Sequence, residues 1–370
     1  MRDMVEIGLG KSAQRGYHLD DIAIVPSRRT RDVDDVSTAW QLDAYRFGIP
    51  CIAHPSDATM SPETIAALGK AGGLGVLNVE GVWTRYEDPR KQLLSIKDNE
   101  HPTRLLQELY SEPIKPDLVA ERVREIRASG VTVAVRVSPQ HTLKLAPVIL
   151  DAGVDILVIQ GTLVSAEHVS TVDEPLNLKE FIADLDLPVI VGGCTNYQTA
   201  LHLMRTGAAG VIVGIGADGL SSTDSVLGIR VPMATAIADA AAARRDYLDE
   251  TGGRYVHLIA DGDVHTSGDI AKALACGADA VMLGMPLTVM AGSPAAGLWW
   301  HPSASHPKLP RGHVGSMEDF VPVPLEKLLF GPSDDASGGL NLFGGLKRAM
   351  AKCGYRDLKE FQKVGLMLDS

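Results

Sequence analysis

The segment Val256–Gly284, VHLIADGDVHTSGDIAKALACGADAVMLG, joins two apolar runs through an amphipathic stretch. The runs Val256–Asp263 and Asp279–Gly284 are apolar at consecutive positions, which is typical of strands buried on both faces of a parallel sheet. Ser267–Cys276 between them has helical spacing and is followed by Gly277, a residue type that favours the end of a helix. The segment therefore predicts a strand–helix–strand unit with parallel strands.

The same unit recurs along the chain. A helix end, a glycine and a new strand follow one another at Ala71–Leu74, Ala152–Asp155, Thr206–Ala209 and Cys276–Asp279. Apolar runs predict eight strands, at Pro50–His54, Leu74–Asn78, Val131–Val137, Val154–Gln160, Pro188–Gly193, Gly210–Gly216, Val256–Asp263 and Asp279–Gly284. Eight such strands within residues 50–284 predict an α/β fold, a (β/α)₈ TIM barrel, because that fold needs about 250 residues. A doubly wound open sheet is the alternative.

The predicted barrel forms one domain with two extensions. We expect a single unit over residues 1–370, with the barrel core at 50–284 and a lead-in at 1–49. Residues 285–370 are expected to supply a C-terminal lid and helices. Residues 79–130, which connect the second and third strands, have a charged and helical pattern.

The C-terminal extension combines loops and helices. Leu298–Gly312 is rich in Pro, Ser and His, and Gly331–Gly339 has the sequence GPSDDASGG, so both are predicted to be loops. Gly344–Leu368 is predicted to be mostly helical, with a break at Gly354. The pair Trp299-Trp300 suits either a lid that stacks on a base or part of a subunit interface.

Composition limits the kinds of partner. Lys plus Arg is 35 and Asp plus Glu is 46, so the net charge is 35 − 46 = −11, which argues against nucleic acid and anionic membranes. No run approaches the ~20 apolar residues of a membrane helix, and no signal peptide is visible. The four cysteines lie far apart in the sequence, so disulfides and a metal site are not expected and a cytoplasmic protein is.

In a TIM barrel the active site is built from loops at the C-terminal ends of the strands. The loops after strands seven and eight commonly bind phosphate, and Gly262, Gly268 and Gly284 would let backbone amides approach its oxygens. Asp261 beside them is an acceptor suited to a ribose diol. Alternatively, the glycines serve turns and Asp261 caps a helix.

Three other strand ends carry candidate groups. The sixth is followed by Gly214–Thr223, GIGADGLSST, a loop with three glycines and three hydroxyls that can wrap an anion or another ligand. After the first strand, His54 and Asp57 could both be functional groups. Alternatively, His54 fills space at the barrel mouth and Asp57 is a turn residue. Cys194 at the fifth is either a reactive thiol or a small buried apolar residue.

As a set, these features resemble the IMP dehydrogenase / GMP reductase family. The resemblance extends over nearly the whole chain, through Leu19–Pro26, Ser56-Asp57, Gly72–Gly75, Gly153–Asp155, Gly214–Gly216, Val231-Pro232, Ala260–Gly262, Ser267–Leu274, Gly277–Gly284, Arg311-Gly312 and Gly344–Leu346. The sequence is most similar to a bacterial branch of IMP dehydrogenase-related proteins without CBS domains. A CBS pair would lie between the second and third strands, where residues 79–130 are too short to hold it.

The resemblance implies a purine nucleoside monophosphate ligand (IMP, XMP or GMP), with NAD or NADP as cofactor and a homotetramer or homo-octamer as the assembly. Asp261 would bind the ribose, and amides near Gly262, Asp263, Gly284 and Met285 would bind the phosphate. The remaining implied nucleotide contacts are Ser56, Asp57, Gly214, Gly216, Gly219 and Leu220. Gln160 and Gly193 would face the cofactor, and Ser221 and Thr223 would be catalytic.

Several family residues differ in this sequence. Ser221 stands where the family has the cysteine that attacks the purine, and a serine hydroxyl needs an adjacent base to react. Gln160 replaces the acid expected at the nicotinamide ribose, Gly219 a phosphate-binding serine, and Pro310 a tyrosine. The hydrolytic flap with its Arg-Tyr pair has no counterpart between Ser316 and Val321, and loss of the cysteine argues against the family's potassium site.

These observations leave several functions open. The first is the oxidation of IMP with NAD and water to XMP and NADH, with Ser221 in place of the cysteine. A GMP reductase-type reaction is the alternative within the same class, because a reductase needs no water attack and so no hydrolytic flap. A purine-nucleotide-binding regulator without the redox step is a second class, and an FMN-dependent barrel a third.

Overall fold

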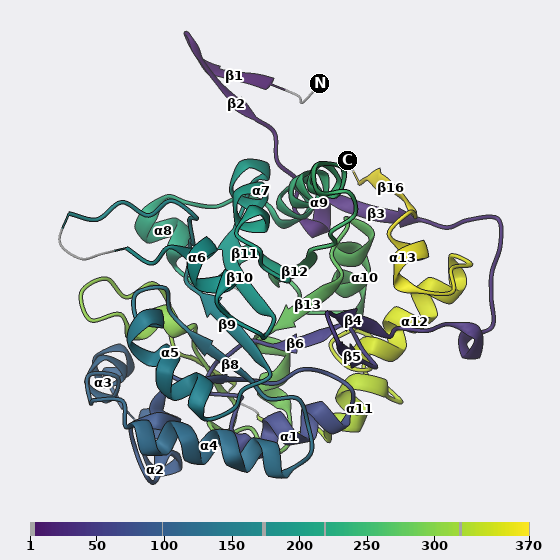
Figure 1. Cartoon of the computed structure of the whole chain (residues 1–370). Helices are drawn as coiled ribbons and strands as arrows, with labels where there is room; N and C mark the ends of the chain where they lie inside the picture. Colours follow the sequence, from purple (N-terminus) through teal and green to yellow (C-terminus); the bar gives the residue numbers. More distant parts are fainter. Residues whose placement is uncertain (1–3, 98, 172–174, 218–219, 318–319, 370) are drawn as a thin grey trace.

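A parallel eight-stranded sheet forms the centre of the molecule (Figure 1). The computed structural model describes residues 4–97, 99–171, 175–217, 220–317 and 320–369. The strands follow the order β6-β13-β12-β11-β10-β9-β8-β7, and every neighbouring pair is parallel. Their bounds are β6 Cys51–Ala53, β7 Val76–Asn78, β8 Ala134–Val137, β9 Ile156–Gln160, β10 Val189–Cys194, β11 Gly210–Ala217, β12 His257–Gly262 and β13 Ala280–Leu283.

The sheet closes on itself between its first two strands in the sequence. Leu74, just before β7, forms a parallel bridge with Ile52 of β6. Ala53 N–H donates to the Leu74 carbonyl at 2.8 Å, and Leu74 N–H donates to the Cys51 carbonyl at 2.9 Å. The predicted eight-stranded TIM barrel is confirmed. Six predicted strands contain the observed one, and β10 and β11 each extend one residue beyond the prediction, to Cys194 and Ala217.

Helices cover the outside of the barrel. Their bounds are α1 Pro62–Lys70, α4 Pro116–Ala128, α5 Thr142–Asp151, α6 Leu178–Ala183, α7 Tyr197–Arg205, α8 Thr223–Leu227, α9 Met233–Thr251 and α10 Ser267–Ala275. Local sequence fixes several of their ends. Ser61 caps α1 and Thr266 caps α10, because each hydroxyl accepts from the backbone N–H of the third residue inside its helix. Gly277 has φ +122° where α10 gives way to β13, in agreement with the predicted glycine stop.

The connection between β7 and β8 forms helices over its described residues. After the 3₁₀ helix η3 (Val82–Thr84) come α2 (Pro89–Lys97), α3 (Pro102–Leu109) and α4. Leu93, Leu106 and Val123, one on each of these three helices, are fully buried in the common core. This agrees with the helical pattern predicted for residues 79–130.

The lead-in contains short strands and 3₁₀ helices. These are β1 Met4–Gly8, β2 Lys11–Gln14, η1 Leu19–Asp21, β3 Ile22–Val25, η2 Val33–Asp35, β4 Trp40–Leu42 and β5 Tyr45–Phe47. β1 and β2 form a hairpin that projects from the barrel at the top of Figure 1.

The C-terminal extension returns to the lead-in. Its elements are η4 Met285–Val289, β14 Leu298–Trp299, η5 Pro302–Ser305, β15 Gly315–Ser316, α11 Leu325–Phe330, α12 Leu342–Lys352, α13 Leu358–Phe361 and β16 Gly365–Leu368. The predicted break at Gly354 is confirmed by its φ of +79°. The helix prediction is wrong for the last four residues of Gly344–Leu368, because β16 pairs antiparallel with β3.

The prediction for the tryptophan pair is also wrong. The side chains of Trp299 and Trp300 are 2% and 0% exposed within a single chain. Trp299 belongs to β14, which pairs with β15, and the Trp300 carbonyl accepts from the Ser56 hydroxyl at 3.1 Å. Both rings are therefore core residues beneath the barrel mouth and do not form a surface for another subunit.

Candidate active site

Three polar side chains and one methionine, from four strand ends, meet inside the C-terminal mouth of the barrel. Asp261 on β12 accepts a hydrogen bond from Gln160 Nε2 on β9 at 3.0 Å. His54, which follows β6, has its Nε2 3.9 Å from Asp261 Oδ2. The same Gln160 nitrogen contacts the sulfur of Met282 on β13 at 3.4 Å. The closed barrel thus places a buried carboxylate at the centre of its mouth.

Asp261 and Gly284, predicted to hold the sugar and the phosphate, both lie against His54. A Cβ built on Gly284 would be 3.5 Å from His54 Cβ, and closer than 3 Å to the Trp299 ring. Asp261 is buried, whereas Gly284 and Met285 are half-buried, so this side of the mouth opens toward solvent.

Two further glycines are required by close backbone packing at the mouth, and a third packs against a side chain. A Cβ on Gly193 would lie closer than 3 Å to the Gly214 carbonyl oxygen, and one on Gly214 equally close to the Asp261 carbonyl oxygen. Gly216 faces His301 Nε2 in the same way. Gly214 and Gly216 also have φ angles of +117° and +67°, which non-glycine residues rarely adopt. These glycines bring β10, β11, β12 and the C-terminal extension together.

His54, which lies beside Asp261, is next to a second imidazole ring, that of His301. The His54 and His301 rings lie 5.2 Å apart between centroids. Burial lowers the pKa of His54 well below its usual value, and nearby His301 and Arg136 act in the same direction. Burial likewise lowers the pKa of His301 to about 3, helped by Arg136 and Arg311. Both rings are therefore neutral at pH 7.

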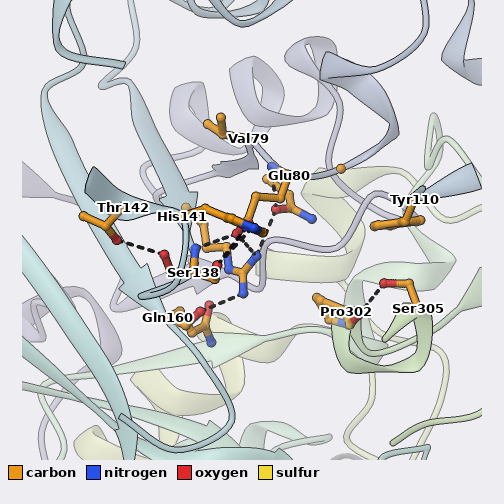
Figure 2. A network of polar contacts seen from close by, with 12 residues as sticks. Val79, Glu80, Tyr110, Ser138, His141, Thr142, Gln160, Pro302 and Ser305 are labelled. Carbon is orange, nitrogen blue, oxygen red and sulfur yellow. Dashed lines mark hydrogen bonds and ion pairs between the residues drawn. The ribbon is translucent and has the colours of Figure 1, made fainter. Parts of the chain in front are cut away.

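A buried ion pair supports the mouth from the β7–β8 side (Figure 2). Arg136 on β8 donates to Glu80 Oε2 at 2.9 Å and, through its other terminal nitrogen, to the Gln160 carbonyl at 2.7 Å. Glu80 also accepts from the Ser138 N–H at 2.5 Å, from the Ser138 hydroxyl at 2.9 Å and from His141 Nδ1. Arg136 thereby anchors the strand end that carries Gln160.

The electrostatics of Glu80 follow from these contacts. Burial alone would raise the pKa of Glu80, but Arg136, His141 and the Ser138 N–H outweigh it and lower the pKa to about 2. Sequence reasoning missed this network. The sequence feature that could have indicated it is Arg136, the one charged residue in the predicted strand Val131–Val137.

Ser221 lies beside the mouth and is half-buried. Its hydroxyl donates to Thr223 Oγ1 at 3.1 Å, and its backbone forms an antiparallel bridge with Gly312. Leu220, one residue earlier, accepts from the His313 N–H through its carbonyl at 2.8 Å. Thr223 is 1% exposed. The structure therefore pairs the two predicted catalytic hydroxyls, and within the described part of the loop the partner of the Ser221 hydroxyl is the alcohol of Thr223.

Ser56 and Asp57 are directed into the protein. The Ser56 hydroxyl donates to Trp300, as described above, and Asp57 Oδ2 accepts from the Val82 N–H at 3.0 Å and from the Tyr110 hydroxyl. Burial raises the pKa of Asp57 to about 6, against the opposing effect of these two hydrogen bonds. In this structure both side chains serve internal contacts.

The predicted phosphate side combines an unusual backbone with one charged pair. Gly262 has φ +137° and Asp263 φ +53°. The Asp263 carboxylate lies 3.4 Å from Arg230 Nη2 and 4.0 Å from His18 Nδ1. Gly268 lies one residue inside the first turn of α10. Gly219, also predicted to contact the nucleotide, lies outside the described residues.

Gln160 has one feature that suits a sugar hydroxyl. Its Oε1 is buried and accepts no hydrogen bond from the described residues. A hydroxyl donor would satisfy this acceptor, so Gln160 fits the ribose of a nicotinamide dinucleotide. Gly193 lies against Gly214 and offers only its backbone to such a ligand. The loop that would correspond to the family's potassium site includes residues 218 and 219, which lie outside the described residues.

Cys194 behaves as a buried apolar residue. It is fully buried, and burial raises the pKa of its thiol to about 12, so it stays protonated at pH 7.

The four cysteines are free, and no three His, Cys, Asp or Glu side chains of the described ranges cluster closely enough to hold a metal ion. Among the described helices, none combines the length and apolarity needed to cross a bilayer.

Two cavities, of about 470 and 490 Å³, lie at the opposite end of the barrel, where β10, β11 and β12 begin. They share Asp43, Ala209 and Arg254.

Comparison with known proteins gives one consistent result. The family model described as "IMP dehydrogenase / GMP reductase domain" matches residues 16–319. An uncharacterized oxidoreductase of Mycobacterium tuberculosis is 61% identical over 98% of this chain and 99% of its own length. An inosine-5'-monophosphate dehydrogenase of Methanocaldococcus jannaschii is 24% identical, over 95% of this chain and 92% of its own.

A solved structure has the same architecture. The crystal structure of an IMP dehydrogenase/GMP reductase-like protein from Corynebacterium glutamicum matches with a TM-score of 0.94 and 54% identity. The match covers 99% of this chain and 98% of that one.

Proposed function

Because this chain belongs to the IMP dehydrogenase / GMP reductase family, we propose that it binds a purine nucleoside monophosphate at its barrel mouth and oxidises it. The proposed reaction is IMP + NAD⁺ + H₂O → XMP + NADH + H⁺. Its support is the family membership, together with the likeness to an inosine-5'-monophosphate dehydrogenase.

One observation carries the proposal. The buried carboxylate of Asp261, held by Gln160, lies near Gly284 and Met285, which are partly exposed to solvent. A carboxylate accepts from both hydroxyls of a ribose, and exposed backbone amides bind phosphate oxygens. Asp261 and Gly284 flank His54, so one nucleotide can reach both. The base would then extend over the loop that begins at Gly214.

The residues near Gln160 would hold the cofactor. Gln160 would accept a hydroxyl of the nicotinamide ribose through Oε1, and Arg136 keeps the Gln160 backbone in place. When bound, the nicotinamide supplies the acceptor for the hydride removed from the purine. We further propose that the protein acts in the cytoplasm as a homotetramer or homo-octamer.

A second candidate follows from Ser221. Its hydroxyl has Thr223 as its described hydrogen-bond partner, and an alcohol does not remove its proton at neutral pH. This favours a protein that binds the nucleotide without the redox step, as a regulator or an assembly partner. A reductase reaction on GMP is the third possibility, because it needs no attack by water.

Thermal melting tests the binding proposal. We expect IMP, XMP or GMP at millimolar concentration to raise the melting temperature, because a ligand at 100 times its Kd adds about 2.7 kcal/mol of stability. The Asp261→Ala variant should lose that shift, whereas Asp249→Ala, exposed on α9, should keep it. If no purine monophosphate stabilises the wild-type chain, the proposed site is wrong.

Nicotinamide absorbance separates the three candidates in the same samples. NADH formation from IMP supports the dehydrogenase, and NADPH consumption with GMP supports the reductase. Nucleotide binding with neither signal supports the second candidate.

A further inference from the structure

The hairpin formed by β1 and β2 is exposed along its whole length (Figure 1). Every residue of β1 is exposed, as are three of the four residues of β2, and Ala13 is half-buried. Ile7 is 66% exposed, and Leu9 at the turn is fully exposed. The described part of the chain therefore leaves apolar side chains of this hairpin in contact with water.

The register of the hairpin separates an apolar face from a mainly polar one. Val5 pairs with Ala13, and residues directly opposite each other point to the same side of the sheet. Ile7 follows Val5 by two positions and lies on the same side, because side chains alternate along a strand. The other side carries the pairs Met4–Gln14 and Glu6–Ser12. A hairpin with this pattern suits an apolar surface on one side and water on the other.

The root of the hairpin is fixed to the barrel. The Tyr17 N–H donates to Thr235 Oγ1 of α9 at 2.8 Å, and the Thr235 N–H donates to the Tyr17 carbonyl at 3.2 Å. A Cβ on Gly16 would lie 3.0 Å from the Pro232 ring. The strands extend beyond this attachment, and a two-stranded hairpin alone in water is marginally stable at best. A partner that covers its apolar face would stabilise it.

A second two-stranded sheet of the same chain has an uncovered apolar face. β16 pairs with β3, so that Met367 lies opposite Ala23 and Gly365 lies opposite Val25. These four residues share one face of the sheet, and all four are exposed. The other face packs on the core through Ile22, which is buried. The outer face of the β3–β16 sheet is therefore free of polar side chains and open to a partner.

We infer that the β1–β2 hairpin docks its apolar face on the outer face of the β3–β16 sheet of a second copy of this chain. The inference rests on the proposed assembly and names the surfaces that form it. Each of the two small sheets gains the packing that it lacks alone. Each copy gives one hairpin and receives another, which is compatible with the closed symmetry of a homo-oligomer.

Charge favours the same partner. Residues 4–16 contain Lys11 and Arg15 against Glu6, a net charge of +1, so the rest of the chain has −11 − 1 = −12. A weakly cationic hairpin is attracted to the acidic body of another copy. The acidic body is repelled by an anionic membrane.

Sedimentation velocity of the full-length protein over a dilution series measures the assembly. We expect an oligomer for the wild type. Ile7→Asp and Met367→Asp should each raise the concentration at which it dissociates by at least ~10-fold, because a charge replaces an apolar side chain in the contact. Ser12→Asp, on the other face of the same hairpin, adds the same charge and should assemble as the wild type does.

A pair of introduced cysteines tests the contact directly. Ile7→Cys combined with Met367→Cys should give disulfide-linked oligomers under mild oxidation, seen on a non-reducing gel. Ser12→Cys combined with Met367→Cys is the control and should stay unlinked. Three of the four native cysteines are buried and the fourth is half-buried, so they do not compete for the link.

The outcomes are distinct. Assembly that persists unchanged in Ile7→Asp or in Met367→Asp overturns this inference alone. A cysteine pair that links within one chain, or not at all, has the same consequence. A monomeric wild type overturns both this inference and the proposed assembly, whether its hairpin then binds phosphatidylcholine vesicles or another protein. A wild type that assembles as expected but is stabilised by no purine monophosphate overturns the proposed nucleotide site and leaves this inference standing.

Discussion

At the scale of single residues, the proposed reaction depends on Ser221, which stands where the resemblance implies a nucleophilic cysteine. Asp261 occupies the predicted position, and Gln160 binds it directly. The Ser221 hydroxyl is hydrogen-bonded to Thr223, and a serine whose neighbour is an alcohol is a poor nucleophile. In the proposed reaction, oxygen in place of sulfur at this position lowers the reactivity of the attacking group.

Replacing Ser221 with cysteine tests this point. A cysteine has a pKa near 8.5, so a few per cent is thiolate at pH 7 without an added base. We expect Ser221→Cys to raise the rate of NADH formation from IMP, or of NADPH consumption with GMP, by at least ~10-fold. Ser225→Cys, exposed on α8, is the control. Equal rates in Ser221→Cys and the wild type would locate the defect on the cofactor side.

Asp57 makes stability depend on pH. Its pKa is raised from 3.8 to about 6, because the folded protein buries the carboxyl group. The folded state therefore holds this proton more tightly than the unfolded state does. The stability it contributes is complete below the unfolded pKa and is lost as the pH rises through about 6.

Asp57→Asn removes this titration. Between pH 5 and pH 7.5, the free energy of unfolding of the wild type should fall by about 1–1.5 kcal/mol relative to that variant. Urea unfolding at both pH values measures the difference. Asp249→Asn, whose side chain is exposed to water, should show a constant difference from the wild type. A constant difference for Asp57→Asn as well would contradict the prediction.

At the scale of elements, close approach of backbones shapes the mouth. Gly193 on β10 packs on Gly214 of β11, and Gly214 packs on Asp261 of β12. The pairing of β11 with β12 shifts register between Val213 and Ala217, where β11 bends past Asp261. These contacts set where the carboxylate lies relative to the loop after β11.

Gly214→Ala should break this arrangement. The new Cβ would clash with the Asp261 carbonyl oxygen, and φ at this position is +117°. We expect a loss of at least ~3 kcal/mol of unfolding free energy, because neither backbone nor carbonyl can yield without moving a strand. The nucleotide-induced rise in melting temperature should also disappear.

Gly228→Ala provides the comparison for that substitution. Gly228 has φ +68° at the end of α8, and a Cβ there would meet nothing within 4 Å. Its cost should be near ~1 kcal/mol, the usual penalty for a non-glycine residue in this backbone region. Similar costs for the two variants in urea unfolding would show that the clash at Gly214 is not decisive.

At the scale of the whole molecule, the C-terminal extension is joined to the barrel by a second buried carboxylate. Asp279 follows α10 and accepts from Arg244 of α9 at 2.6 Å and from Lys359 of α13 at 2.7 Å. The Leu258 N–H and the Tyr255 hydroxyl donate to it as well, at 2.9 and 2.6 Å. One side chain thus links the barrel floor, its longest helix and the C-terminus.

Asp279→Ala should therefore destabilise the whole fold. It leaves the buried Arg244 guanidinium without its partner, and breaking a buried pair in this way costs ~3–5 kcal/mol. Chemical denaturation of the full-length protein measures the loss. Glu250→Ala removes the partner of Arg205 in a pair exposed on both sides and should cost less than ~1 kcal/mol. Equal costs for the two variants would contradict the prediction.

Local sequence patterns determined the elements of this protein. Apolar runs such as Val256–Asp263 must be buried on both faces, and glycines such as Gly277 end helices, so eight strands and a closed barrel follow from short-range information. The same rule placed Asp261 and Gly284 at one rim. β16 escaped prediction because its partner β3 lies more than 300 residues earlier in the chain.

Tertiary structure alone decided the surroundings of those groups. His301 and Trp299 come from a loop-like stretch with no regular pattern, and only packing against Gly216 and Gly284 gives them a place. Arg136 reaches Glu80 and Gln160 because the closed sheet brings three strand ends together. Hydrogen-bond partners and burial depend on contacts between distant segments, whereas periodicity reports only on neighbours in the chain.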